Sequence, residues 1–279
     1  MDNITNKDLR KLQKCELEIL KEFVRICNKY NLKYSLAFGT LLGAARHEGF
    51  IPWDDDIDVM MPIDDYKIFE EIVNKELNKK FFFQNISTDK NYYLYWDKIR
   101  MNNTISIVKG YEDIKINWGI CIDIFPIFKV PLTMKEQQNH IKNLKLANVC
   151  LNSNLYKKGK IHNTTLKTKI FYNLINLFPR SVINKISNIF YKKIYNYNGK
   201  YDKYVDYCEL YSRIIVYDKN IFDNMEVLNF EGYEFNVVNN YKKVLKQLYG
   251  DYMKLPPKEE RVAHGNLILK FNKGKSNDE

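Results

Sequence analysis

Four aspartates fall within five positions of the chain, at Asp54, Asp55, Asp56 and Asp58. The run Asp56-Ile57-Asp58-Val59 predicts a strand whose side chains alternate between faces, so Asp56 and Asp58 share a face. Two carboxylates held side by side repel each other, and each raises the pKa of the other unless a cation lies between them. A metal ion is the simplest such cation.

One further acid interrupts an otherwise apolar strand, which is predicted over residues 120–125. Alternation points Cys121, Asp123 and Phe125 to one face and the three isoleucines to the other. A lone buried carboxylate costs on the order of several kcal/mol unless it is paired or bound to a metal. We therefore expect Asp123 to share a site with Asp56 and Asp58.

The segment before the aspartates predicts the elements that position them. Helical spacing of apolar residues begins after Thr5 and continues to Tyr30, and residues 33–38 alternate as a strand that Gly39 ends. Thr40 is placed to cap a short helix through Ala45, and the free N–H groups of that helix would suit a phosphate. Gly39 and Thr40 are thus candidate phosphate-binding residues.

This order of parts resembles the nucleotidyltransferase fold: a glycine after a strand, a short helix, an Asp-x-Asp strand and a later single Asp. A narrower resemblance, to the LicD/fukutin-related phosphotransferases, is carried by four separated segments: GTLLGAARHEGFIPWDDDIDV (39–59), YWDKIR (95–100), GICIDIFPI (119–127) and YGDYMKLPPKEERVAH (249–264). The fold class expected is α/β, a nucleotidyltransferase-like mixed sheet flanked by helices, with a mainly helical insertion or subdomain.

The resemblance implies transfer of a phospho-alcohol, phosphocholine foremost, from a CDP-activated donor to a hydroxyl of a cell-surface glycan or its lipid-linked precursor, with release of CMP. It implies Mg²⁺ (or Mn²⁺) as cofactor, held by Asp56 and Asp58 with Asp54, and Asp123 completing the site as ligand or as base. Hard oxygen ligands suit this ion, which neutralises phosphate charge.

Several cations and one aromatic residue are further candidates for the site. We expect Arg46, Lys98 and Arg100 to balance diphosphate charge. Pairing with the acids is the alternative for Arg46 and His47, and the choice is left open for His47. Solvated surface charge is the alternative for Lys98 and Arg100. Trp53, Arg261 and His264 are candidate substrate contacts. The alternatives are that Trp53 only packs in the core and that Arg261 and His264 lie on a surface helix.

Other readings of the acidic cluster are a solvated loop or helix cap, a calcium loop and a P-loop. A calcium loop fails because Val59 takes the place of its glycine and Asp65 the place of its final glutamate. A P-loop is excluded because the segment lacks the lysine of that motif.

The alternative functions are nucleotidyl transfer to a small molecule and a non-catalytic, membrane-associated nucleotide-binding protein.

The net charge of +10 on 279 residues is concentrated in one segment. Residues 137–201 contain Lys and Arg but no Asp or Glu. Our hypothesis is that residues 166–194 rest on the inner membrane leaflet, with lysines toward anionic lipid. No nucleic-acid-binding module is recognisable, so nucleic acid is not an expected partner.

No export signal or membrane-spanning run is apparent, so we expect a cytoplasmic protein, peripheral on the inner face of the membrane under that hypothesis. The expected organisation is a catalytic core over residues 1–134, a basic helical insertion over 135–201, a C-terminal part over 202–269 that completes the site, and a disordered tail over 270–279.

Overall fold

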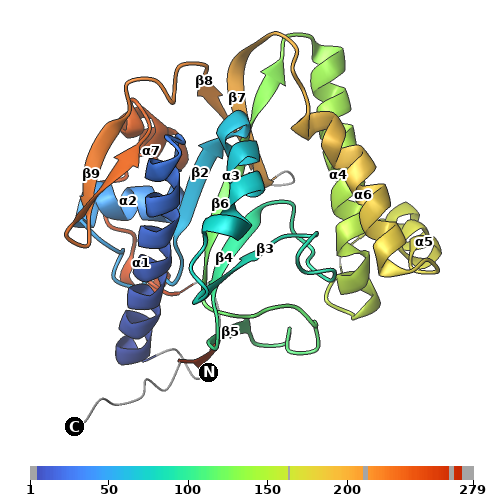
Figure 1. The fold of residues 1–279 in the computed structure, drawn as a ribbon, viewed down its shortest axis with the longest axis horizontal. Helices are drawn as coiled ribbons and strands as arrows, with labels where there is room; N and C mark the ends of the chain where they lie inside the picture. The colour runs from blue at the N-terminus through green and yellow to red at the C-terminus, as the bar shows by residue number, and fades with distance from the viewer. Residues whose placement is uncertain (1–4, 163, 210–212, 264–266, 272–279) are drawn as a thin grey trace.

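A computed structural model describes residues 5–162, 164–209, 213–263 and 267–271. The first half of the chain alternates helices and strands: α1 (Asn6–Lys29), β1 (Ser35–Leu36), α2 (Phe38–His47), β2 (Asp58–Pro62), α3 (Ile63–Glu76), β3 (Phe81–Gln84), β4 (Asp97–Met101), β5 (Ile105–Val108) and β6 (Cys121–Pro131). Strands β1 to β4 and β6 belong to one central sheet, and Figure 1 shows α1 and α3 beside it.

The central sheet is mixed, with the order β1-β2-β6-β4-β3. Strands β2 and β6 pair in parallel, and β6 pairs antiparallel with β4 on the same stretch. The far half of β6 pairs with β7 (Tyr201–Glu209), which in turn pairs with β8 (Arg213–Asp218). Strand β6 is therefore the central scaffold, because it joins the N-terminal strands to the C-terminal ones.

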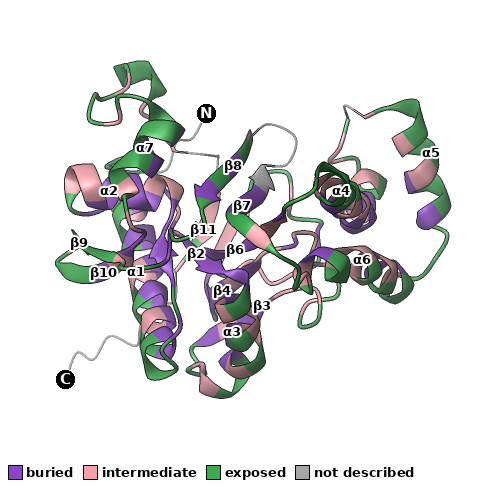
Figure 2. Cartoon of the chain, turned by 90° about the horizontal axis from the view of Figure 1, so that it is seen from above, coloured by how far each residue is buried: buried purple, intermediate pink, exposed green. Residues whose placement is uncertain are grey.

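Helices α4 (Met134–Lys157), α5 (Leu166–Ile175) and α6 (Arg180–Tyr195) form a separate layer to one side of the sheet (Figure 1). Thr133 caps α4, because its hydroxyl accepts a hydrogen bond from the N–H of Glu136. Figure 2 shows that α5 lies at the outer edge of the molecule and that much of its surface is exposed. None of the helices in the described part of the chain is both long and apolar enough to cross a membrane.

The C-terminal part returns to the core on the opposite side of the sheet. Its elements are the hairpin β9 (Glu226–Phe230) and β10 (Tyr233–Val237), helix α7 (Tyr241–Tyr249), the 3-10 turn η1 (Lys258–Glu260) and β11 (Leu267–Lys270). Strand β11 pairs antiparallel with β5, so the end of the described chain lies beside its first half.

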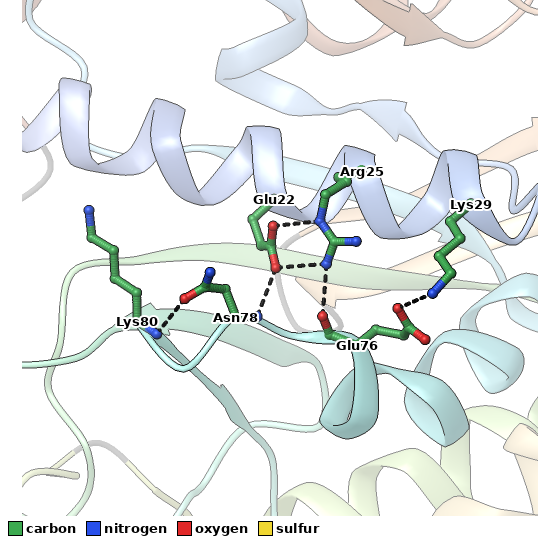
Figure 3. A network of polar contacts seen from close by, with 6 residues as sticks. All are labelled: Glu22, Arg25, Lys29, Glu76, Asn78 and Lys80. Carbon is green, nitrogen blue, oxygen red and sulfur yellow. Dashed lines mark hydrogen bonds and ion pairs between the residues drawn. The ribbon is translucent and has the colours of Figure 1, made fainter.

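Helix α1 is amphipathic and packs a continuous apolar stripe into the main core, where the rings of Phe23 and Phe69 lie 5.2 Å apart. Its exposed side is joined to the end of α3 and the loop that follows by a polar network (Figure 3). Arg25 binds Glu22 at 2.8 Å and donates to the carbonyl of Glu76, and Lys29 binds the Glu76 carboxylate at 2.6 Å. Such exposed pairs add little stability individually, so the apolar stripe is the main anchor of α1.

The predicted α/β class, with a mixed sheet flanked by helices and helices inserted after β6, is confirmed. Three local expectations differ from the structure. Strand β2 begins at Asp58, so Asp56 lies in the loop before the strand. Helix α2 begins at Phe38 without a side-chain cap, and the Thr40 hydroxyl accepts a hydrogen bond from the N–H of Asp58 instead. Lys270, the first residue of the expected tail, lies in β11, and residues 272–279 are outside the described residues.

Candidate active site

Asp58 and Asp123 are register partners on the parallel strands β2 and β6. The N–H of Asp123 donates to the carbonyl of Ile57 at 2.9 Å, which fixes this register just where β2 begins. Two acids that are far apart in sequence are therefore brought side by side by the sheet. This is the pairing that the sequence pattern predicts.

Two donors from the neighbouring strand region hold the Asp123 carboxylate. The Lys98 ammonium lies 2.5 and 2.7 Å from its two oxygens, and the Trp96 indole N–H donates to the same group. Burial lowers the pKa of Lys98, but the charges of Asp123 and Cys121 and the hydrogen bond to Asp123 together outweigh burial, so the pKa is raised. Lys98 is thus a charged partner of Asp123 on the sheet.

The cluster carries an excess of negative charge. Loss of hydration raises the pKa of Asp58 well above its usual range, and the charges of Asp56, Asp123 and Asp54 raise it further. Glu16 of α1 is buried, one of its oxygens has no hydrogen-bond partner, and burial together with Asp56 raises its pKa strongly. One lysine does not balance this set, so the cluster would gain from a further cation.

Gly39 and Thr40, in the first turn of α2, contact the aspartate segment. A Cβ at Gly39 would lie 2.7 Å from an oxygen of Asp54, so only glycine lets this carboxylate lie against the helix. Thr40 fixes the first residue of β2 through the hydrogen bond described above. Both residues therefore position the acids, and this role is separate from the phosphate contact predicted for them.

A cavity of about 230 Å³ opens beside this cluster. Asp56, Asp123 and Lys98 are among its lining residues, and so is Arg100. Arg100 is buried, donates to the carbonyl of Gly119 at 2.6 Å and to Gln84, and lies 5.8 Å from the ring of Trp118. The predicted pair Lys98 and Arg100 thus faces one cavity together with the acids.

Arg46 and His47 lie at the end of α2 and contact the C-terminal loop. The Arg46 guanidinium donates to the carbonyl of Tyr252 at 2.8 Å and to His47 at 3.0 Å. Burial and the neighbouring Arg46 lower the pKa of His47. In this structure Arg46 fastens residues 252–254 to α2.

Trp53 and Arg261 contact each other, with the guanidinium 5.6 Å from the indole ring. Arg261 also donates to the carbonyl of Pro256 at 3.0 Å, and its neighbours form the short turn η1. His264 lies outside the described residues.

The number of carboxylates in this cluster fits a magnesium ion that also binds substrate phosphates. Among the described residues, no three His, Cys, Asp or Glu side chains are grouped closely enough to hold a metal by themselves. Magnesium, however, usually takes one or two carboxylates together with substrate phosphates and waters. The adjacent carboxylates Asp58 and Asp123 match that requirement.

Glu16, Trp96 and Tyr92 belong to this site and were not singled out by sequence patterns. A signal existed for Glu16, because it occupies a position of the apolar stripe between Leu12 and Leu20 where a charged residue is unexpected. Trp96 lies within the YWDKIR segment (95–100), but no local pattern assigned it a role, because that role depends on the pairing of β4 with β6.

Comparison with known proteins places these features in a family. The family model described as LicD/FKTN/FKRP, nucleotidyltransferase domain, matches residues 31–149. That range contains the paired aspartates together with Lys98 and Trp96, so fold and site define a nucleotidyltransferase-type domain.

The chain is 31% identical over 273 residues to the lipopolysaccharide cholinephosphotransferase LicD of Haemophilus influenzae, covering 92% of this chain and 95% of that protein. A shorter match, 41% identical over 56 residues, covers 20% of this chain and 18% of an uncharacterized protein of Rickettsia typhi. The chain therefore belongs to the LicD family of phosphotransferases.

Proposed function

We propose that the protein transfers phosphocholine from CDP-choline to a hydroxyl of a cell-surface glycan and releases CMP. The observation that carries this proposal is the Asp58–Asp123 pair, which lies within a chain that matches a cholinephosphotransferase over nearly its whole length. That relative acts on lipopolysaccharide, so a lipopolysaccharide or a lipid-linked glycan precursor is the acceptor we favour.

In the proposed reaction, the acceptor oxygen forms a bond to the phosphorus of phosphocholine, and the bond from that phosphorus to the bridging oxygen breaks, so that CMP leaves. Asp58 and Asp123 would hold Mg²⁺, which would neutralise the negative charge on the diphosphate. Transfers of this kind depend mainly on positioning and charge stabilisation.

The chain's own cations have two roles in this scheme. Lys98 holds Asp123 in place and faces the cavity, where it can also balance phosphate charge. Arg100 is fixed by Gln84 and Gly119 and lines the same cavity. The proton of the acceptor hydroxyl passes to a carboxylate of the cluster.

Product analysis tests this function. Purified protein with Mg²⁺, CDP-choline and a glycan acceptor should release CMP and label the glycan with phosphocholine. Pyrophosphate release from a nucleoside triphosphate would instead support nucleotidyl transfer. If the protein binds nucleotide but forms no product with any donor of a CDP-alcohol panel, the result would support a non-catalytic binding protein.

The exposed apolar face of α5 supports the proposed membrane contact. Five large apolar side chains recur at helical spacing along α5 and the turn after it, each more than half exposed: Leu166, Ile170, Leu174, Leu177 and Phe178. Lys167 and Lys169 are exposed on the same helix. We propose that this face rests on the inner leaflet, where a lipid-linked acceptor would be presented.

A further inference from the structure

A second cavity, of about 300 Å³, lies between the catalytic core and the helical layer. It is lined by α3, by the segment that leads into β4, and by α6, with Glu70 and Asp97 on the core side. Asp97 and Lys98 are consecutive in β4 and point to opposite faces of the sheet. This cavity is therefore separate from the one that holds Asp123.

Two acids face this cavity, and the charge of Glu70 acts on Lys67, whose ammonium lies 5.0 Å from the centre of the Tyr195 ring. Asp97 is 3% exposed, and one of its carboxylate oxygens has no hydrogen-bond partner. Glu70 accepts from the hydroxyl of Tyr195. Among the described residues, no Lys, Arg or His nitrogen lies within 4.0 Å of either carboxylate, and Lys192, which also lines the cavity, is exposed.

Three tyrosine rings line the same cavity, and those of Tyr95 and Tyr191 supply the rest of a cation-binding environment. The ring of Tyr191 lies 6.3 Å from that of Tyr95 and 5.6 Å from that of Tyr195, and all three residues line the cavity. The Tyr191 hydroxyl is buried and has no hydrogen-bond partner. Aromatic faces combined with carboxylates are the environment in which proteins bind quaternary ammonium groups.

From these contacts we propose that the cavity between α3, β4 and α6 binds a quaternary ammonium group, on the carboxylates of Asp97 and Glu70 and the rings of Tyr95 and Tyr191. Asp97 and Glu70 hydrogen-bond to each other, so a proton is shared between the two buried carboxyl groups. The pair keeps a buried negative charge, and a bound cation would offset the cost of that charge. Burial and the charge of Glu70 raise the pKa of Asp97, and an opposite charge in contact would favour its ionised form.

The cavity also adjoins the candidate active site. Leu94 lines both cavities, and the ring of Tyr95 lies 5.2 Å from that of Trp96, which donates to Asp123. Two sources can supply the same ligand chemistry: free choline, and the choline of a CDP-choline donor. Only the second source rests on the proposed function.

Ligand-observed NMR on the trimethylammonium signal of choline tests the site without any turnover. Choline should bind the full chain at least about tenfold more tightly than 3,3-dimethyl-1-butanol, its uncharged isostere. Glu70→Gln should weaken choline binding by a similar factor, while Glu71→Gln, at an exposed neighbouring position of α3, should not change it.

Ring substitution provides a second test. Tyr191→Leu should weaken choline binding about as much as Glu70→Gln, whereas Tyr191→Phe, which keeps the ring, should retain it. Absence of choline binding, equal binding of the uncharged isostere, or equal binding by wild type and Glu70→Gln would overturn the proposal.

CDP and CDP-choline separate the two sources. If the site holds the donor's choline, Glu70→Gln weakens CDP-choline binding and leaves CDP binding unchanged. If it holds free choline, Glu70→Gln weakens choline binding and leaves CDP-choline binding unchanged. A protein that binds choline here yet transfers no phosphocholine would refute the proposed function while leaving this site intact.

Discussion

Asp58 and Asp123 stand directly beside each other on the parallel strands β2 and β6, although 64 residues separate them in the chain. Each is fixed by a contact outside its own strand: the N–H of Asp58 by Thr40, and the Asp123 carboxylate by Lys98 and Trp96. The pair is thus part of the rigid sheet, as the proposed diphosphate site would require.

The first prediction concerns Trp96. Trp96→Phe keeps most of the packing against Phe125 and removes the indole hydrogen bond to Asp123. A hydrogen bond to a charged group is worth about 1.5–3 kcal/mol, so the rate of CMP release should fall by roughly tenfold or more. Tyr30→Phe removes an exposed tyrosine hydrogen bond to Glu76 and should leave the rate unchanged. An unaltered rate in Trp96→Phe would show that the indole does not position Asp123.

The second prediction concerns the glycines of α2. A Cβ at Gly43 would lie 2.5 Å from the backbone oxygen of Gly49, which has little freedom to move. Gly43→Ala should therefore lower the free energy of unfolding by about 1–3 kcal/mol, despite the helix preference for alanine. Gly39→Ala should lower the free energy of unfolding by less, because the added Cβ meets only the tip of the Asp54 side chain. Urea denaturation of both variants measures this, and a Gly43→Ala protein more stable than wild type would refute the close packing.

The third prediction is a pH dependence of stability that arises from Asp97. Its pKa is raised well above the ordinary 3.8 by burial and by Glu70, so the folded protein holds this proton to higher pH than the unfolded chain does. Stability from this group therefore falls as the pH rises above about 4. From pH 5 to pH 8, the free energy of unfolding of the wild type should fall. In Asp97→Asn this fall should be smaller by at least about 1 kcal/mol. Identical slopes in urea denaturation would contradict this assignment.

The fourth prediction concerns the exposed face of α5. The double substitution Leu174→Glu/Leu177→Glu adds charge to two exposed positions of that face. Binding to anionic phospholipid vesicles should fall at least about tenfold, because each exposed leucine contributes about 1.5–3 kcal/mol when it is buried in lipid. Val227→Glu, at an exposed position of β9, is the matched control. Sedimentation with vesicles measures the difference, and equal binding by all three proteins would rule out this face.

Sequence patterns predicted the parts of the site that lie within single strands. Alternation in residues 120–125 singled out Asp123, and the acids before β2 singled out Asp58. The contributions of Trp96 and Glu16 depend on how β4 and α1 pack against β6, and local spacing does not encode that packing. The β5–β11 pairing joins segments about 160 residues apart and could not be predicted from local spacing for the same reason.

The lining of the second cavity could not be predicted from local sequence spacing either. Asp97 lies within the YWDKIR segment, yet local spacing gave no reason to pair it with Glu70 of α3 or with tyrosines of α6. The helical layer that completes this cavity follows β6, so its place beside α3 is a property of the whole fold.

The most direct test of the central claim is the rate of CMP release from CDP-choline, with Mg²⁺ and a glycan acceptor, in wild type and Asp123→Asn. Asp202→Asn, at an exposed position of β7, is the matched control, and near-UV circular dichroism confirms that each variant is folded. We predict a rate about 10²–10⁴-fold lower for Asp123→Asn and an unchanged rate for Asp202→Asn. A folded Asp123→Asn protein that releases CMP as fast as wild type would contradict the account.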